Sequence, residues 1–220
     1  MSKGTALIVG VGPGLGLALA EAFARDGHPV ALFGRDAVRL ENHAAELTSQ
    51  GFTAGAYQAD AGDSEALRAA LGRAVDDRGA PEVLVYNAAV LQADTPTGLD
   101  ADAWAQTLAV NVTGAVVAAQ TVLPLLRDGR GSLLFTGGGL ALRPSPEYTT
   151  LSVGKAALRA YVQALHDNHV GPDVHACTVT VAGAIGGEDP RFAPEALAAA
   201  YLDLHQQPRD QWKAELVYAS

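Results

Sequence analysis

The sequence alternates short runs of β-branched and apolar residues with longer helical patterns from one end to the other. Strands are expected at Ala6–Val9, Pro29–Phe33, Thr53–Tyr57, Val83–Tyr86, Ser132–Thr136, Val174–Val181 and Ala214–Tyr218. Helices are expected near Gly14–Asp26, Ala37–Gln50, Ser64–Asp77, Ala101–Leu126, Thr150–Val170 and Pro194–Leu204. This alternation is typical of a parallel sheet with helices on both faces. We therefore predict an α/β fold: one doubly wound, seven-stranded parallel sheet in three layers, formed by a single domain over residues 1–220.

Composition narrows the classes of partner. The formal net charge is −9, from 24 acidic and 15 basic residues, so the surface repels nucleic acid. Cys177 is the only cysteine and lies in an apolar run, which excludes an internal disulfide. The apolar stretch Thr5–Ala20 is interrupted by glycines and Pro13, unlike a signal peptide. No uninterrupted apolar run reaches the roughly 18 residues that span a bilayer, so we expect a cytoplasmic protein without a membrane partner.

A glycine-rich turn follows the first expected strand and opens the first helix. Its glycines are Gly10, Gly12, Gly14 and Gly16, with Leu15 between the last two. Glycines in this position let the backbone approach a pyrophosphate at a helix N-terminus, although glycine also serves ordinary tight turns. The spacing fits G-x-x-x-G-x-G and not G-x-G-x-x-G. We predict a Rossmann-like dinucleotide site that includes these five residues.

The end of the second expected strand bears on which dinucleotide is bound. An acidic side chain there would bind the ribose 2′-hydroxyl of NAD, whereas an arginine holds a 2′-phosphate. The first charged residue after the strand is Arg35. NADP(H) is therefore expected, with NAD(H) less favoured, unless Arg35 is only a solvated surface charge. Asp36 is expected to cap the following helix.

Further motifs occur in a fixed order along nearly the whole chain. They are Asp60-Ala61-Gly62-Asp63, Asn87-Ala88-Ala89, Asn111-Val112-Thr113-Gly114 and Lys155-Ala156-Ala157. Together with the glycine turn, they resemble the short-chain dehydrogenase/reductase family. The resemblance implies that Asp60 orients the adenine and that Asn87 packs beside the cofactor. Asp63 would cap a helix.

The resemblance also implies roles near the nicotinamide. Asn111 would support a proton-relay water, although a lone asparagine also fits a buried polar residue that bends a helix. Lys155 would point inward and bind the nicotinamide ribose, although a helical lysine is usually solvated. Gly183 follows the sixth strand, where Ala182 replaces the family's proline, and Ile185 would lie near the carboxamide.

Two hydroxyls that the resemblance predicts are missing. The family's proton-donating tyrosine stands four residues before the lysine, and that position is Leu151. The serine that orients the substrate carbonyl stands thirteen residues earlier, at Gly138. Neither side chain can donate or accept a hydrogen bond. Since loss of a positioned general acid costs about 10²–10⁴ in rate, ordinary alcohol–ketone exchange should be slow or absent.

Three residues are candidates for a substitute donor: Tyr148, Ser152 and Thr136. Each also fits an ordinary structural role: Tyr148 as a loop aromatic, Ser152 as a helix-surface hydroxyl and Thr136 as a strand residue. Tyr148 combines reach with suitable acid chemistry if the helix begins early enough, which Pro146 allows. The predicted catalytic residues are therefore Asn111, Lys155 and Tyr148, with no metal site.

Three hypotheses follow. The first is an NADP-dependent oxidoreductase with an altered proton donor, or with a small-molecule substrate, such as an enone or imine, that needs none. The second is a cofactor-binding pseudoenzyme with an assembly or regulatory role, and the third is a non-redox isomerase or lyase. We expect a homodimer or homotetramer, because the helical patterns within Ala109–Leu126 and from Thr150 carry more apolar positions than one sheet face covers.

Overall fold

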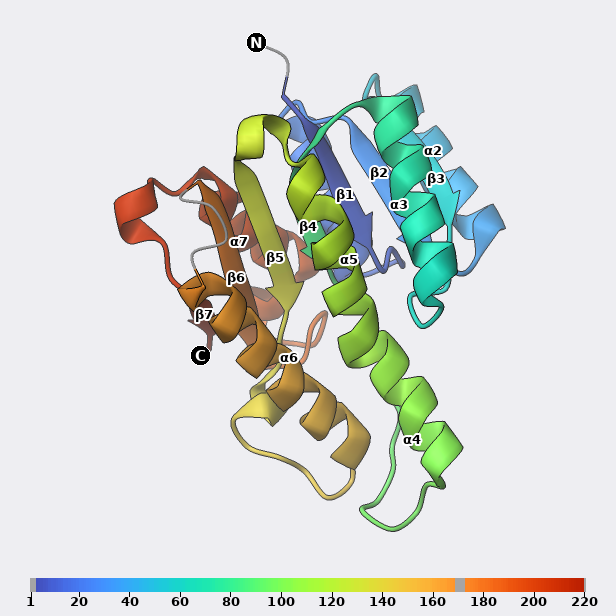
Figure 1. Cartoon of the computed structure of the whole chain (residues 1–220), viewed down its shortest axis with the longest axis vertical. Helices are drawn as coiled ribbons and strands as arrows, with labels where there is room; N and C mark the ends of the chain where they lie inside the picture. Colours follow the sequence, from blue (N-terminus) through green and yellow to red (C-terminus); the bar gives the residue numbers. More distant parts are fainter. Residues whose placement is uncertain (1–2, 169–172, 220) are drawn as a thin grey trace.

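The computed structural model describes residues 3–168 and 173–219. Within them, seven strands form one sheet in the order β3-β2-β1-β4-β5-β6-β7 (Figure 1). Their bounds are β1 Thr5–Val9, β2 Val30–Gly34, β3 Ala54–Gln58, β4 Pro81–Tyr86, β5 Gly131–Thr136, β6 Val174–Val181 and β7 Glu215–Tyr218. Each neighbouring pair is parallel. The predicted doubly wound α/β fold is confirmed.

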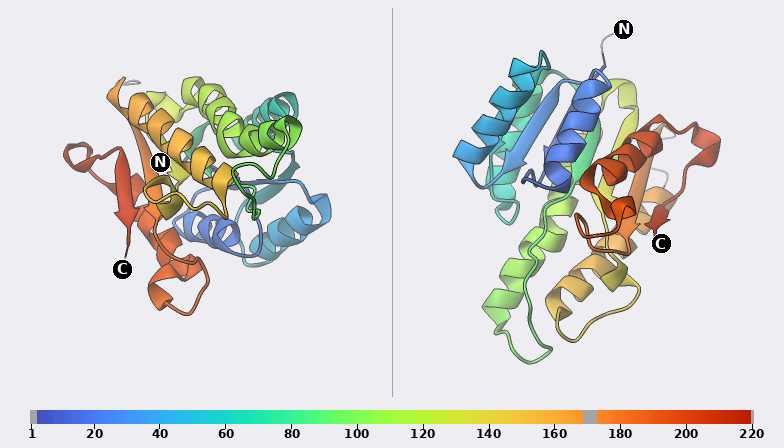
Figure 2. Two further views of the ribbon diagram at one scale, coloured as in Figure 1. Left: turned by 90° about the horizontal axis from the view of Figure 1, so that it is seen from below. Right: turned by 180° about the vertical axis from the view of Figure 1, so that it is seen from behind.

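The helices cover both faces of this sheet, as Figures 1 and 2 show from opposite sides. Their bounds are α1 Leu15–Arg25, α2 Ala37–Ser49, α3 Ser64–Arg78, α4 Ala101–Leu108, α5 Gly114–Val122, α6 Thr149–Asp167 and α7 Pro194–Gln206. Helices α1, α2 and α7 contribute to one apolar core, and α3, α5 and α6 to the other. β1 is buried throughout because each face of the sheet lies against one of these cores.

Side chains at the helix ends explain where several helices begin. The carboxylate of Asp36 accepts a hydrogen bond from Arg39 N, and that of Asp63 accepts two, from Glu65 N and Ala66 N. Both expected caps are therefore present. Short 3-10 helices complete the loops, at Leu123–Leu125, Arg127–Gly129, Gly139–Ala141, Pro190–Phe192 and Arg209–Gln211.

The helix predicted over Ala101–Leu126 is not continuous. A π-helical turn at Ala109–Thr113 separates α4 from α5, and α5 ends at Val122. The physical reason lies in the turn itself, where the Tyr86 hydroxyl donates a 2.6 Å hydrogen bond to the Val110 carbonyl. The other predicted helices agree within a few residues, except that the last positions predicted for α6, residues 169–170, lie outside the described residues.

By length and composition alone, the helical stretch Ala101–Leu125 is apolar enough to cross a membrane, with a mean hydropathy of 1.6. Its α5 part nevertheless packs into the core through Ala115, Ala118 and Val122, which are fully or almost fully buried. Core helices commonly satisfy the same length and composition criterion, so the stretch is weak evidence for a membrane span.

Candidate functional site

A cleft of about 1090 Å³ opens at the carboxyl ends of the strands. It spans the point between β1 and β4 where the strand order reverses, which is where open α/β sheets bind ligands. The expected cofactor-binding residues that line it are Gly10, Gly12, Leu15, Arg35, Asp60, Asn87, Lys155, Gly183 and Ile185. The structure therefore brings together residues that are far apart in the sequence.

The four glycines of the first turn fall into two pairs. Gly10 has a positive φ of 95°, and a Cβ there would lie 2.4 Å from Ala88 N. A Cβ on Gly16 would lie 2.4 Å from the Gly10 carbonyl oxygen. A Cβ on Gly12 or Gly14 would meet no atom within 4 Å. Packing thus requires glycine at Gly10 and Gly16, whereas Gly12 and Gly14 leave bare backbone that faces open space.

This bare backbone leads into the N-terminus of α1, which no side chain caps. The first-turn amides of a helix carry partial positive charge and bind anions such as phosphate. A pyrophosphate therefore fits the turn, with Gly12 on the cleft side.

Two arginines lie at the end of the cleft that follows β2. Arg35 and Arg39 are both exposed and line it, and Arg39 Nη2 lies 3.4 Å from Asp36 Oδ2. The sequence analysis identified Arg35 and missed Arg39. Arg35 precedes the helix cap at Asp36, so helical spacing did not point to Arg39, which is the third residue of α2. Together they make this end of the cleft suitable for a dianionic phosphate.

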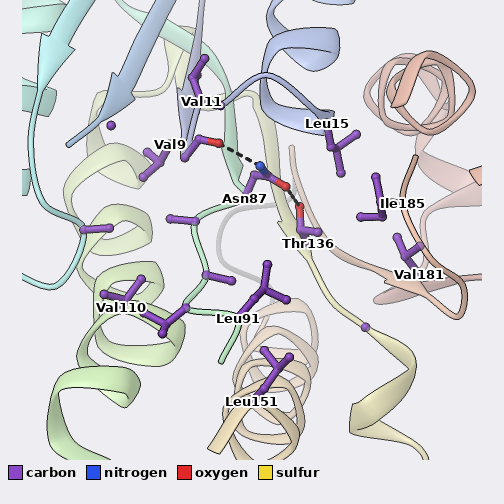
Figure 3. A pocket seen from close by; sticks show the side chains of 18 of the residues that line it. Val9, Val11, Leu15, Asn87, Leu91, Val110, Thr136, Leu151, Val181 and Ile185 are labelled. Atoms are coloured by element: carbon purple, nitrogen blue, oxygen red, sulfur yellow. Dashed lines mark hydrogen bonds between the residues drawn. The ribbon is translucent and has the colours of Figure 1, made fainter. Parts of the chain in front are cut away.

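Asn87 joins the glycine turn to the end of β5. Its Nδ2 donates a 2.9 Å hydrogen bond to the Gly10 carbonyl, and its Oδ1 accepts one of 3.0 Å from the Thr136 hydroxyl (Figure 3). Asp60 lies exposed at the rim, where its Oδ1 accepts a 2.8 Å hydrogen bond from Gly62 N. Asn87 therefore sets the shape of the cleft floor, and Asp60 presents a carboxylate at its edge.

Lys155 is only 8% exposed and lines the inner part of the cleft. Its Nζ donates a 2.6 Å hydrogen bond to the Thr136 carbonyl, and burial lowers its pKa to about 8. Leu151, one helical turn earlier on α6, also lines the cleft. A Cβ on Gly138 would lie 3.7–3.9 Å from the Lys155 methylene carbons. The two positions at which the family resemblance predicts hydroxyls thus flank this lysine.

The inner end of the cleft is otherwise apolar. Figure 3 shows Leu15, Val181 and Ile185 on one side, with Leu91 and Leu151 opposite them. Ile185 is 41% exposed although it is large and apolar. A bound planar ring would cover this surface, which is a favourable use of exposed apolar area.

Asn111 does not line the cleft. Its Oδ1 accepts a 2.7 Å hydrogen bond from Val90 N, and its Nδ2 donates one of 3.3 Å to Val90 O. The side chain is buried within the π-helical turn, and its two hydrogen bonds hold Val90, which lines the cleft after β4. The structure therefore gives Asn111 a positioning role, closer to the buried polar residue that was the alternative interpretation.

Tyr148 requires a correction, because the structure does not place it in the cleft. It precedes the first residue of α6, is 40% exposed and is absent from the lining residues. The helix begins too late for Tyr148 to share a face with Leu151. The other two candidates are also engaged: Ser152 Oγ donates to the Tyr148 carbonyl, and the Thr136 hydroxyl bonds Asn87 and Tyr201.

A family profile described as short chain dehydrogenase matches residues 4–185. The chain belongs to this family. Over 152 residues, the chain is 33% identical to the 2-(S)-hydroxypropyl-CoM dehydrogenase 3 of Xanthobacter autotrophicus, a match that covers 69% of the present chain and 60% of that relative's length.

Solved structures resemble the chain over almost its full length. An alcohol dehydrogenase from Thermococcus sibiricus, complexed with 5-hydroxy-NADP, is 26% identical with a TM-score of 0.87 and covers 99% of both chains. A metagenomic short-chain oxidoreductase in complex with NADP is 21% identical with a TM-score of 0.88, covering 99% of this chain and 97% of that one. The second likeness establishes the fold alone.

Proposed function

We propose that the chain is an NADP(H)-dependent reductase of the short-chain dehydrogenase type. Its substrate would be a polarised double bond, such as an enone, an imine or an activated carbonyl. One observation carries the proposal: Gly138 and Leu151 leave Lys155 as the only ionisable side chain on the β5 and α6 side of the cleft, among the described residues that line it. The other ionisable lining residues follow β2 and β3.

The cofactor part rests on features of this chain. Gly12 and Gly14 would accommodate the pyrophosphate at the start of α1, and Arg35 with Arg39 would hold a 2′-phosphate. NADPH, when bound, supplies the hydride in such a reduction. The 5-hydroxy-NADP bound in the 26% identical alcohol dehydrogenase structure supports the choice of dinucleotide.

Lys155 would supply the proton. Reduction adds one hydride and one proton across the double bond, and the ammonium group of Lys155 carries a proton at neutral pH. Its hydrogen bond to the Thr136 carbonyl keeps Nζ at the inner end of the cleft, which Lys155 and Gly138 both line. Water then returns a proton to the lysine. A substrate whose double bond is already polarised needs no further hydroxyl to orient it.

Two measurements test this proposal. Calorimetric titration should give tighter binding of NADPH than of NADH, with the preference lost in Arg35→Ala/Arg39→Ala. The exposed Arg73 on α3, outside the cleft lining, provides the matched control Arg73→Ala.

The second measurement is NADPH oxidation in the presence of ketones, enones and imines. Tight binding without turnover of any compound would favour the pseudoenzyme, and turnover without net NADPH oxidation would favour the isomerase or lyase.

Self-association and a cytoplasmic location stay predictions. Val153 on α6 is exposed and would be covered if α6 packed against a second copy. Light scattering at micromolar concentration tests this, and a monomer would contradict it.

A further inference from the structure

A second cavity of about 640 Å³ adjoins the cleft. Its lining includes Gly139, Leu140, Val181 and Gly183, which also line the cleft. The cavity therefore opens from the inner end, next to Gly138 and Lys155, and extends toward β7. We call this cavity the side lobe.

The walls of the side lobe are almost entirely apolar. Besides the shared residues, Ala182, Leu142, Val217 and Ala219 form them. Leu142 is 45% exposed and Val217 is 48% exposed, which is much for large aliphatic side chains. A hydrocarbon group bound here would remove this area from water, a favourable change of roughly 25 cal/mol per Å².

Arg143 is the one charged residue in this lining, which lies wholly in the described part of the chain. Its backbone N donates a 3.0 Å hydrogen bond to the Gly139 carbonyl, so the residue is anchored to the turn after β5. Arg25, Arg39, Arg159 and Arg191 each pair with a carboxylate. Within residues 3–168 and 173–219, no hydrogen bond or ion pair engages the Arg143 guanidinium.

A lone guanidinium at an apolar cavity favours one class of ligand. Arginine presents five donors in a planar fork that matches a carboxylate. A ligand with an apolar chain and a carboxylate can pack its chain against the apolar walls and pair its carboxylate with Arg143. An uncharged ligand of the same length would cover the apolar walls and leave Arg143 to water.

We propose that the side lobe binds an aliphatic carboxylate, with Arg143 at the carboxylate and Leu142 and Val217 against the chain. That this carboxylate is the substrate rests on the proposed function, with the double bond of the acid at the Lys155 end of the side lobe. Binding of the carboxylate in the side lobe does not depend on turnover.

The test is calorimetric titration with nonanoate, with 1-nonanol and butanoate as matched probes, in the presence and absence of NADPH. We expect nonanoate to bind at least tenfold more tightly than either probe. Arg143→Gln should remove most of that advantage without changing the affinity for 1-nonanol, and Arg143→Lys should keep part of it. Arg73→Gln, an exposed change on α3 away from both cavities, should have no effect.

Two results would overturn the proposal. One is equal affinity of the wild type and Arg143→Gln for nonanoate. The other is absence of nonanoate binding together with a change of oligomeric state in Arg143→Gln, seen by light scattering, which would assign the side lobe to a contact between copies of the chain. NADPH titration of the same proteins separates failure of the side-lobe proposal from failure of the proposed function. Nonanoate binding without NADPH binding would refute the reductase and leave the side-lobe proposal standing.

Discussion

Lys155 Nζ donates a 2.6 Å hydrogen bond to the carbonyl oxygen of Thr136, the last residue of β5. The Thr136 hydroxyl is held in turn, 3.0 Å from Asn87 Oδ1 and 2.8 Å from the Tyr201 hydroxyl. The lysine on α6 is thereby tied to a strand end that β4 and α7 both support. Its ammonium group is buried and has a fixed place in the cleft, unlike a solvated helical lysine.

Turnover should follow the protonation of Lys155. Burial lowers its pKa to about 8, so the acid form predominates below pH 8 and is lost above it. With a substrate identified by the NADPH screen, we expect kcat to be level below pH 8 and to fall about tenfold per unit well above it. Lys155→Met should reduce kcat by roughly 10²–10⁴ and remove this pH step.

Tyr148→Phe is the matched control for this experiment, since Tyr148 lies outside the cleft lining. It should leave both kcat and the pH profile unchanged. A pH step that survives in Lys155→Met, or a large loss in Tyr148→Phe, would contradict the assignment of the proton to Lys155.

Restoring the two hydroxyls should broaden the activity. Gly138 has an extended φ of −166°, and a Cβ there makes ordinary contacts of 3.7–3.9 Å, so Gly138→Ser fits without strain. Leu151→Tyr would place a phenol one helical turn before Lys155, whose positive charge lowers the phenol pKa. We expect the double variant to reduce an unactivated ketone at least 10²-fold faster than the wild type, measured by NADPH oxidation.

The control Gly138→Ser/Leu151→Phe has the same aromatic ring without the phenol hydroxyl. If it reduces the ketone as fast as the tyrosine variant does, the gain in rate does not come from proton donation.

The two pairs of glycines should respond differently to substitution. In Gly16→Ala, the new Cβ would lie 2.4 Å from the Gly10 carbonyl, so we expect a loss of stability of about 1–3 kcal/mol by urea unfolding. In Gly12→Val, the side chain meets no atom within 4 Å at its Cβ and projects toward the cleft, so the fold should persist while NADPH affinity falls at least tenfold. Unchanged NADPH affinity in a folded Gly12→Val protein would argue against a pyrophosphate at this turn.

Stability should fall in mild acid because of His205 on α7. Burial, and then the neighbouring His28, lower the pKa of His205 to about 4, although Glu82 opposes this shift. The unfolded chain takes up a proton near the ordinary value of 6.5, so between pH 6.5 and 4 the unfolded state binds more protons than the folded state. The free energy of unfolding should therefore decrease by roughly 3 kcal/mol over this interval, with no contribution from this residue above pH 6.5.

Urea unfolding at several pH values tests this, with His205→Gln as the comparison. The variant retains a polar group for Ser132 Oγ, which lies 2.9 Å from His205 Nδ1. Its unfolding free energy should depend less steeply on pH, and an equally steep dependence in both proteins would rule out His205 as the cause.

The order of strands and helices, the glycine turn and the caps at Asp36 and Asp63 could all be predicted from the sequence. These features depend on local chemistry: apolar runs form buried parallel strands, and a carboxylate before a helix accepts its free amides. The inward position of Lys155 and the missing hydroxyls at Gly138 and Leu151 came instead from the resemblance to the short-chain dehydrogenase/reductase family, which assigns a role to each of these three positions. The positions of Tyr148, Asn111 and Arg143 depended on where α6 begins, on the π-helical turn and on how two loops meet beside β7. Those are contacts between segments distant in the chain, whose geometry is decided by packing and not by local pattern.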